Sequence, residues 1–339
     1  MIKGSDQMVI HASIGHGKTL ILNRKASLIL QPRKPYNFDA NFHKPSHFPS
    51  SDNVWEEGKY WITMVWQGKK LGLKFEDEGR AEKPKIELTV FSQKALSQEY
   101  VRNLVPEIRW RFNFDQDISD FCSRFENDKI LGPAIRKWRG MKPIAANSLY
   151  ETLIIYIVLQ NAVVRRSVQM LENLFSKFGK KAEFDNKVLS VFWEPKKMAK
   201  STETELRALK VGYRAKFFMK ITEQFASGAI DEFALRKVSR DEVKKEVQKL
   251  YGIGPASTEY LLFEDFYFLD GLERVPSWEQ KIMSRLLFNK QLVPVEEILN
   301  FFRTRYKGCE KLAFHYIWED LFWRRKHEHI EWLEKEIRL

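Results

Sequence analysis

The hydrophobic pattern of this chain changes its period near residue 115. Before that point, short β-rich or alternating segments lie at 19–30, 60–66, 71–75 and 86–91. Turn-forming residues separate these segments, and Pro, Asn, His and Ser crowd residues 32–53. After Phe114, apolar residues recur at helical spacing almost throughout. This order predicts an α+β fold, with an antiparallel β-rich domain over 1–112 and an all-α region over 113–339.

The second region divides into helices at residues that favour caps and turns. The first helix begins near Asp117-Ile-Ser-Asp, where Asp or Ser can cap it. We expect helices at 117–126, 129–138, 147–160, 162–178, 187–193, 196–200, 203–208, 213–227, 231–236, 240–249, 255–263, 277–288, 294–305 and 308–335.

The charge balance favours a polyanionic partner. The chain of 339 residues has 57 Lys+Arg against 45 Asp+Glu, a formal charge of +12 and a pI near 9.4. Its two cysteines, Cys122 and Cys309, are too few for a disulfide framework or a four-thiolate cluster. The apolar run 153–159 is far shorter than the ~20 residues of a membrane span, and no signal peptide pattern is present. We therefore expect a soluble intracellular protein without membrane contact, and abundant Lys and Glu suggest a thermophile.

The segment Lys249-Leu-Tyr-Gly-Ile-Gly-Pro-Ala-Ser-Thr-Glu-Tyr-Leu-Leu262 indicates two helices joined by a two-glycine turn. The amides from Gly252 to Ala256 can then point at one anion, with the N-terminus of the second helix behind them. A DNA phosphate fits such a turn, although a tight turn between helices uses glycine in the same way. The predicted phosphate-binding residues are Lys249, Gly252, Gly254, Ser257 and Thr258.

A single carboxylate follows this turn in the sequence. Val275-Pro-Ser-Trp-Glu279 places Glu279 just after a proline-led turn and at the start of the next helix. One held phosphate and one nearby carboxylate are expected of a site that cuts a base from its sugar. The alternative is that Glu279 only caps its helix, because carboxylates are common at helix N-termini.

Six motifs occur in an order that points to one known family. They are 114–121 (Phe-Asp-Gln-Asp-Ile-Ser-Asp-Phe), 149–160 (Leu-Tyr-Glu-Thr-Leu-Ile-Ile-Tyr-Ile-Val-Leu-Gln), 211–216 (Val-Gly-Tyr-Arg-Ala-Lys), the turn at 250–262, 275–279, and 313–318 (Ala-Phe-His-Tyr-Ile-Trp). From residue 112 to 325 the chain resembles the helix-hairpin-helix DNA glycosylase superfamily. Within it, the 3-methyladenine DNA glycosylase II branch is most similar, and 8-oxoguanine DNA glycosylase is next.

This resemblance implies the architecture and the partners. The helical region is then a helix-hairpin-helix glycosylase core of two subdomains with a cleft between them, preceded by a β-rich domain. The partner is double-stranded DNA that carries a damaged base, and the protein is a monomer in the cytoplasm of a prokaryote. The family needs no redox or nucleotide cofactor, although Na⁺ or K⁺ could bind among the hairpin carbonyls.

The sequence departs from the family at two catalytic positions. The family has an aspartate where the spacing Pro276-Ser-Trp-Glu279 puts a glutamate; with a shorter spacing, Trp278 falls there and no carboxylate remains. The lysine that attacks the sugar in bifunctional members is replaced by Ala256. We therefore expect a monofunctional enzyme that hydrolyses the N-glycosidic bond and leaves an abasic site. Lys281 is expected to contact phosphate rather than to act as a substitute nucleophile.

Base excision requires that the target nucleotide leave the stack, so the resemblance also implies residues that open the duplex. Gln160 or Asn161 takes the place of the family residue that fills the gap, and Arg165 lies one turn further on. Tyr213 resembles the family's intercalating aromatic residue, with Arg214 available for phosphate, although a tyrosine there could equally belong to the core.

The predicted base pocket consists of aromatic rings. Trp318 takes the family position that stacks on the flipped base, Tyr260 should face it, and Trp278 precedes the carboxylate. Such rings stack well on cationic, alkylated bases, which favours an alkyl-base glycosylase. The alternatives are a glycosylase for oxidised purines such as 8-oxoguanine, and a non-catalytic lesion-binding protein on the same scaffold. His327 and His329 lie on different helix faces, so no metal site is expected.

Overall fold

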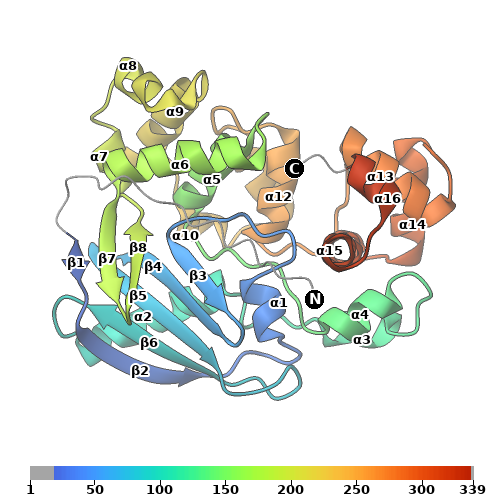
Figure 1. The fold of residues 1–339 in the computed structure, drawn as a ribbon, viewed down its shortest axis with the longest axis horizontal. Helices are drawn as coiled ribbons and strands as arrows, with labels where there is room; N and C mark the ends of the chain where they lie inside the picture. Colours follow the sequence, from blue (N-terminus) through green and yellow to red (C-terminus); the bar gives the residue numbers. More distant parts are fainter. Residues whose placement is uncertain (1–18, 337–339) are drawn as a thin grey trace.

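The computed structural model describes residues 19–336 and has the predicted α+β composition. Two β-sheets come mainly from the first part of the chain, and helices make up most of the remainder (Figure 1). Within residues 19–336, no helix combines the length and the apolar character that a membrane span requires. The predicted domain boundary at residue 112 stays a prediction.

A five-stranded antiparallel sheet forms the base of the molecule, with the strand order β2-β6-β5-β4-β3. Its strands are β2 (Arg24–Leu30), β3 (Asn53–Glu56), β4 (Lys59–Trp66), β5 (Lys69–Asp77) and β6 (Ile86–Ser92). Helices α1 (Phe38–Phe42) and α2 (Gln98–Arg111) supply buried side chains to the core on one face of this sheet. The alternation of apolar residues in the strands makes this face a continuous apolar surface.

A small three-stranded sheet packs on the other face. It contains β1 (Leu20–Ile21), β7 (Lys180–Phe184) and β8 (Lys187–Val191). Asp185 and Asn186 both have positive φ and form the two-residue turn of a β-hairpin. A Cβ on Gly72 of β5 would lie 2.5 Å from the Phe184 ring, so the close packing of the two sheets requires glycine there. The predicted helix at 187–193 is therefore wrong, and the region expected to be all-α contains this hairpin.

One group of helices lies beside the sheets and shares one apolar core. Its elements are α5 (Leu149–Leu159), α6 (Val164–Phe178), α7 (Pro195–Met198), α8 (Glu203–Leu206), the π-helical turn η1 (Arg207–Val211), α9 (Arg214–Ala226), α10 (Glu232–Leu235), α11 (Arg240–Val247) and α12 (Pro255–Glu264). Capping boxes at Ser148, Thr202 and Ser239 begin three of these helices.

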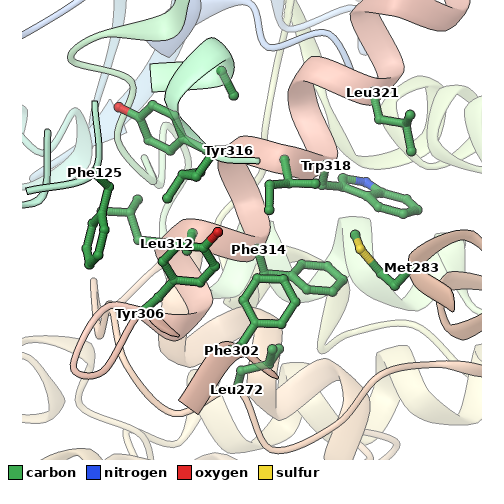
Figure 2. Packing of buried hydrophobic residues seen from close by; sticks show 14 of the residues in the cluster. Phe125, Leu272, Met283, Phe302, Tyr306, Leu312, Phe314, Tyr316, Trp318 and Leu321 are labelled. Atoms are coloured by element: carbon green, nitrogen blue, oxygen red, sulfur yellow. The ribbon is translucent and has the colours of Figure 1, made fainter. Parts of the chain in front are cut away.

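A second group of helices surrounds a separate core on the far side of α12 (Figures 1 and 2). Its elements are α3 (Ser119–Phe125), α4 (Gly132–Trp138), α13 (Ser277–Phe288), α14 (Val295–Arg305), α15 (Glu310–His327) and α16 (Glu331–Glu336). The single helix predicted at 308–335 is thus two helices, because Glu328 leaves the helical conformation at the end of α15.

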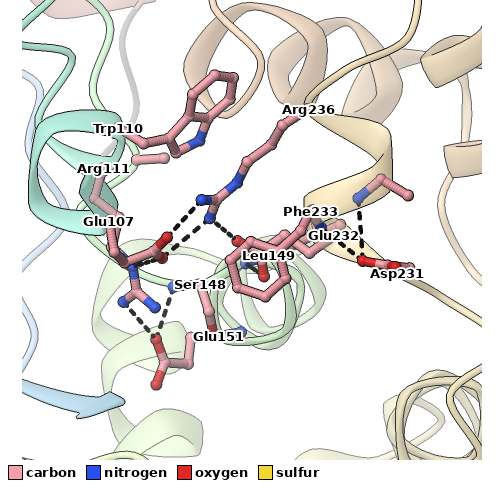
Figure 3. A network of polar contacts seen from close by, with 12 residues as sticks. Glu107, Trp110, Arg111, Ser148, Leu149, Glu151, Asp231, Glu232, Phe233 and Arg236 are labelled. Atoms are coloured by element: carbon pink, nitrogen blue, oxygen red, sulfur yellow. Dashed lines mark hydrogen bonds and ion pairs between the residues drawn. The ribbon is translucent and has the colours of Figure 1, made fainter. Parts of the chain in front are cut away.

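Buried ion pairs join the sheet side to the helical side (Figure 3). Glu107 of α2 accepts hydrogen bonds from Arg111 Nε at 2.7 Å and from Arg236 Nη1 at 2.5 Å. Arg236 also pairs with Glu232 of α10, and Arg111 Nη1 lies 3.6 Å from Glu151 of α5. Burial raises the pKa of Glu107, but the two guanidinium groups outweigh burial and hold its pKa below the ordinary value. The network therefore fixes α2 against α5 and α10.

Removing one member of this network should destabilise the whole fold. We predict that Arg236→Met lowers the free energy of unfolding by about 3–5 kcal/mol, because Glu107 and Glu232 lose a buried cation. Arg124→Met breaks an exposed pair with Asp120 and should cost less than about 1 kcal/mol. Urea or thermal unfolding of both variants measures the difference. Equal losses in the two variants would contradict a structural role for the network.

Candidate functional site

The turn between α11 and α12 has the local geometry that the two glycines predict. Gly252 has φ +85°, and a Cβ there would lie 2.8 Å from the Phe217 ring. Gly254 is the N-cap of α12, and Pro255 is its first residue. The first turn of a helix leaves amide N–H groups without intrahelical partners, so α12 directs free donors out of its N-terminus.

The predicted phosphate-binding residues do not all face outward. Lys249 is exposed and pairs with Glu246 at 2.6 Å, and Gly254 has open space where a Cβ would stand. Ser257 is half-buried in the first turn of α12. Thr258 is buried, and its hydroxyl donates to the Gly254 carbonyl at 3.1 Å. Thr258 thus stabilises the helix start from inside and does not offer its side chain to a ligand.

Two side chains hold the end of α5, one by a bond to this turn and one from the start of α9. Gln160 Nε2 donates to the Gly252 carbonyl at 2.8 Å. Arg214 is buried, and its guanidinium donates to the carbonyls of Ile157, at 3.0 Å, and of Gln160. The donors of Arg214 thus hold the end of α5, and its expected contact with phosphate stays a prediction. Gln160 is likewise engaged inside the protein.

Asn161 and Tyr213 lie together on the surface beside the turn. Asn161 is exposed with φ +49°, and its amide donates to the Tyr213 hydroxyl at 3.3 Å. Tyr213 is 44% exposed and packs edge-on against Phe217, the ring next to Gly252. Arg165 is also exposed. Of the residues predicted to open a duplex, these three are available on the surface.

Glu279 is buried and hydrogen-bonded to the second helix of the turn. It lies in the first turn of α13 and is 3% exposed. Its Oε1 accepts a hydrogen bond from the Tyr260 hydroxyl of α12 at 2.8 Å. No side chain caps the N-terminus of α13, where Pro276 is the N-cap residue. The carboxylate therefore joins α12 to α13 rather than capping its own helix.

Burial is the largest influence on the pKa of both Glu279 and Tyr260. Burial raises the pKa of Glu279, while Lys311 and the bond from Tyr260 act in the opposite direction. Burial and then the charge of Glu279 raise the pKa of Tyr260 well above 10, so its hydroxyl stays protonated and donates. Lys311, in the first turn of α15, is a member of this site that the sequence analysis missed.

A cavity of about 380 Å³ is lined in part by Tyr260. Its walls come from the 41–53 segment, residues 144–147, α5 and α12. The lining includes His43, Lys44, Ser46, His47, Phe48, Asp52, Asn147, Tyr156, Tyr260, Glu264 and Asp265. The size and the mixture of aromatic and polar groups suit a small planar ligand. No residue of the 41–53 wall was predicted from the sequence, although the crowding of His, Asn, Pro and Ser at 32–53 indicated a polar segment there.

The wall formed by the 41–53 segment is anchored to the helices. Glu319 of α15 accepts hydrogen bonds from the Ser46 backbone N–H at 2.9 Å and from its hydroxyl at 2.5 Å. Burial raises the pKa of Glu319 to about 6. His43 stacks on Trp55 at 4.3 Å, and burial lowers the pKa of His43 to about 3, so its imidazole is neutral.

The other predicted pocket rings lie elsewhere. Trp318 is 9% exposed and packs among Phe314, Phe322 and Met283 in the core of the second helical group (Figure 2). Trp278 meets Trp318 edge-on at 5.0 Å and is partly exposed. Neither ring lines this cavity, and the expected aromatic pair around a base stays a prediction. The Trp318 ring fills part of this core. Helical spacing in the sequence cannot distinguish an aromatic residue that packs in a core from one that lines a base pocket.

The remaining predicted residue, Lys281, is exposed on α13, 3.8 Å from Glu336. Among the residues from 19 to 336, no three His, Cys, Asp or Glu side chains converge in a way that could hold a metal ion.

Comparison with known proteins identifies relatives of the chain, although no family model matches it. A DNA-3-methyladenine glycosylase of Bacillus subtilis is 21% identical over 254 residues, which cover 70% of this chain and 82% of the relative. The 3-methyladenine DNA glycosylase of Archaeoglobus fulgidus superposes with a TM-score of 0.67 at 14% identity, covering 87% of this chain and 99% of the other.

An 8-oxoguanine glycosylase/lyase of Clostridium acetobutylicum has the same fold. Its TM-score is 0.63 at 17% identity, and the match covers 89% of this chain and 99% of the other. The homologues and structural neighbours of this chain are therefore DNA glycosylases of the helix-hairpin-helix superfamily, as the order of its motifs predicted.

Proposed function

We propose that this protein is a DNA N-glycosylase of base excision repair. The observation that supports this proposal best is a buried carboxylate, Glu279, whose hydrogen-bond donor Tyr260 also lines a cavity that can take a planar base. The positive net charge and the free amides at the start of α12 supply the attraction for DNA phosphates. Homologues that are named as glycosylases agree with this activity.

In the proposed cycle, the turn between α11 and α12 acts as the DNA-binding hairpin. A phosphate of the damaged strand binds the amides beyond Gly254, where no side chain obstructs its approach. Asn161 and Tyr213 enter the duplex and fill the space that the flipped nucleotide leaves. Lys249, Ser257, Lys281 and Arg165 are the remaining DNA contacts that we propose.

Chemistry then depends on Glu279. As the N-glycosidic bond breaks, positive charge develops on the deoxyribose, and the Glu279 carboxylate stabilises that charge and orients the attacking water. The Tyr260 bond fixes the carboxylate before the substrate arrives, so little reorganisation is needed during the reaction. Ala256 stands exposed where bifunctional relatives have lysine, which supports hydrolysis without a covalent intermediate.

The damaged base is proposed to enter the cavity beside Tyr260. An alkylated, cationic base would stack on the aromatic lining. An oxidised purine is the second candidate, because Ser46, His47 and Glu264 give the lining hydrogen-bonding groups that recognise a polar base edge. Na⁺ or K⁺ at the hairpin carbonyls stays a prediction; the Gly252 carbonyl already accepts from Gln160, and no step above depends on a cation.

The carboxylate can be tested directly. We predict that Glu279→Gln lowers single-turnover base release by about 10²–10³-fold, because an amide cannot balance the developing positive charge. The measurement is a release assay on duplexes that carry 3-methyladenine, 7-methylguanine, 8-oxoguanine, uracil or hypoxanthine. Glu296→Gln is the matched control, since Glu296 also lies in the first turn of a helix that follows a proline but is exposed.

Equal release by the wild type and Glu279→Gln would remove the proposed role of this carboxylate. Tight binding to an abasic-site mimic without release of any base in the panel would favour the rival, a non-catalytic lesion-binding protein. Preferential release of 8-oxoguanine would establish the second candidate substrate.

The two glycines of the turn offer a test of phosphate binding. We predict that Gly254→Ala leaves the melting temperature nearly unchanged, because open space surrounds its Cβ, but weakens DNA binding by about tenfold or more by obstructing the phosphate. Gly252→Ala should instead destabilise the protein, since it combines φ +85° with a clash against Phe217. Fluorescence anisotropy with labelled duplex and thermal unfolding separate the two effects. Unchanged DNA affinity in Gly254→Ala would exclude this turn as the phosphate site.

A further inference from the structure

Lys311 is a buried cation that the cycle above does not use. It is the second residue of α15 and is 8% exposed. Its Nζ lies 5.0 Å from the centre of the Tyr260 ring and 5.4 Å from the centre of the Phe314 ring. Its backbone N–H donates to the Leu269 carbonyl at 3.1 Å, which fixes the start of α15. A lysine is almost never buried unless a nearby anion or polar group stabilises its charge, so the burial of Lys311 suggests a function for its ammonium group.

The ammonium of Lys311 acts on nearby carboxylates without pairing with them. Within residues 19–336, it forms no ion pair, and its contacts are the two ring faces. Lys311 nevertheless lowers the pKa of Glu279 and of Glu259, against the larger and opposite effect of burial in each. The Tyr260 ring therefore lies against the cation while its hydroxyl reaches Glu279.

The other charged groups around Glu279 do not replace this cation. On α13 itself, the Lys281 ammonium lies 3.8 Å from the Glu336 carboxylate, and the Arg285 guanidinium lies 5.0 Å from the centre of the Trp332 ring. Both cations are therefore engaged with residues of α16. On α15, burial and then the charges of Lys44 and Lys311 hold the pKa of His315 well below its ordinary value, so the ring is neutral.

On α12, the titratable groups other than Tyr260 are acidic. Glu259 and Glu264 both add negative charge around the Tyr260 hydroxyl. A second negative charge nearby disfavours ionisation of a carboxyl group, as burial does. The α15 cation thus opposes the effect of burial on Glu279.

We propose, on the basis of the proposed function, that Lys311 is a positioning residue for base release, which acts on the Glu279 carboxylate from across the Tyr260 ring. A direct ion pair would occupy a carboxylate oxygen and hold it away from the sugar. A cation on the ring acts through space instead, and Glu279 Oε2 has no hydrogen-bond partner among the described residues. The arrangement therefore provides an anion that is both stabilised and free to face the reacting sugar.

The first test does not depend on activity. The carboxyl ¹³C signal of Glu279, identified by its absence in Glu279→Gln, is titrated by NMR in the wild type, Lys311→Met and Lys311→Arg. Removing a unit charge at this range should move the titration midpoint up by about one to two pH units. Lys311→Met should show this shift, whereas Lys311→Arg should stay near the wild type. Lys85→Met is the control, because Lys85 is exposed beside the five-stranded sheet and pairs with Glu78.

The second test follows base release against pH. Glu279 acts as an anion, so the rate falls as pH drops through its pKa. Lys311→Met should move this acid limb upward by the same interval as the NMR midpoint, and Lys311→Arg should restore it. Lys311→Gln is a second neutral variant in case methionine prevents folding. If no lesion is released by the wild type, the NMR titration alone decides the proposal.

Three results would overturn the proposal. The first is an unchanged NMR midpoint in folded Lys311→Met or Lys311→Gln. The second is a rate loss in these variants that is equal at every pH, which would indicate a role in packing or base binding. The third is a borohydride-trapped complex of the wild type with DNA that disappears in Lys311→Met, since the amine would then be the group that attacks the sugar.

Discussion

The architecture depends on charges buried where the sheet meets the helices. Glu107 on α2 is held by Arg111 from its own helix and by Arg236 beside α10. A buried ion network of this kind adds little net stability over an apolar one, but it tolerates only one relative placement of its members. The cavity beside Tyr260 has walls from both sides of this junction. The network therefore helps to hold the two sides of this junction together.

The catalytic proposal rests on a second set of groups, the buried Glu279 and Lys311 and the partly exposed Tyr260 between them, in which each influences the others. Tyr260 donates to Glu279 and presents its ring to Lys311. Burial alone would favour a neutral Glu279, and the Lys311 charge and the tyrosine bond oppose that effect. The chain thus has an ionisable carboxylate in a desolvated position, where electrostatic stabilisation of a developing cation is strongest.

Part of the site could be predicted because it is local in sequence. The Gly252-Ile-Gly254 turn and Glu279 after Pro276 follow from residue chemistry over a few positions, and the structure has both features. The sequence did not indicate that the side chains of Arg214, Gln160 and Thr258 bond to backbone carbonyls of other segments or of their own helix start. Nothing in a polar residue's identity shows whether it faces solvent or satisfies a buried carbonyl. In the same way, nothing in the identity of an aromatic residue such as Trp318 shows whether its ring packs in a core or lines a pocket.

The sequence by itself determined the α+β order, most of the helices, the glycine turn and the start of a helix just before Glu279, because these depend on periodicity and on conformational preferences of neighbouring residues. Only the tertiary structure decided that 180–191 is a hairpin, that residues 41–53 form a wall of the cavity, and that Lys311 lies over Tyr260. Each of these three features brings together residues that are far apart in the chain. The free energy that selects them comes from packing and from the burial of charge, and neither has a signature within a short segment.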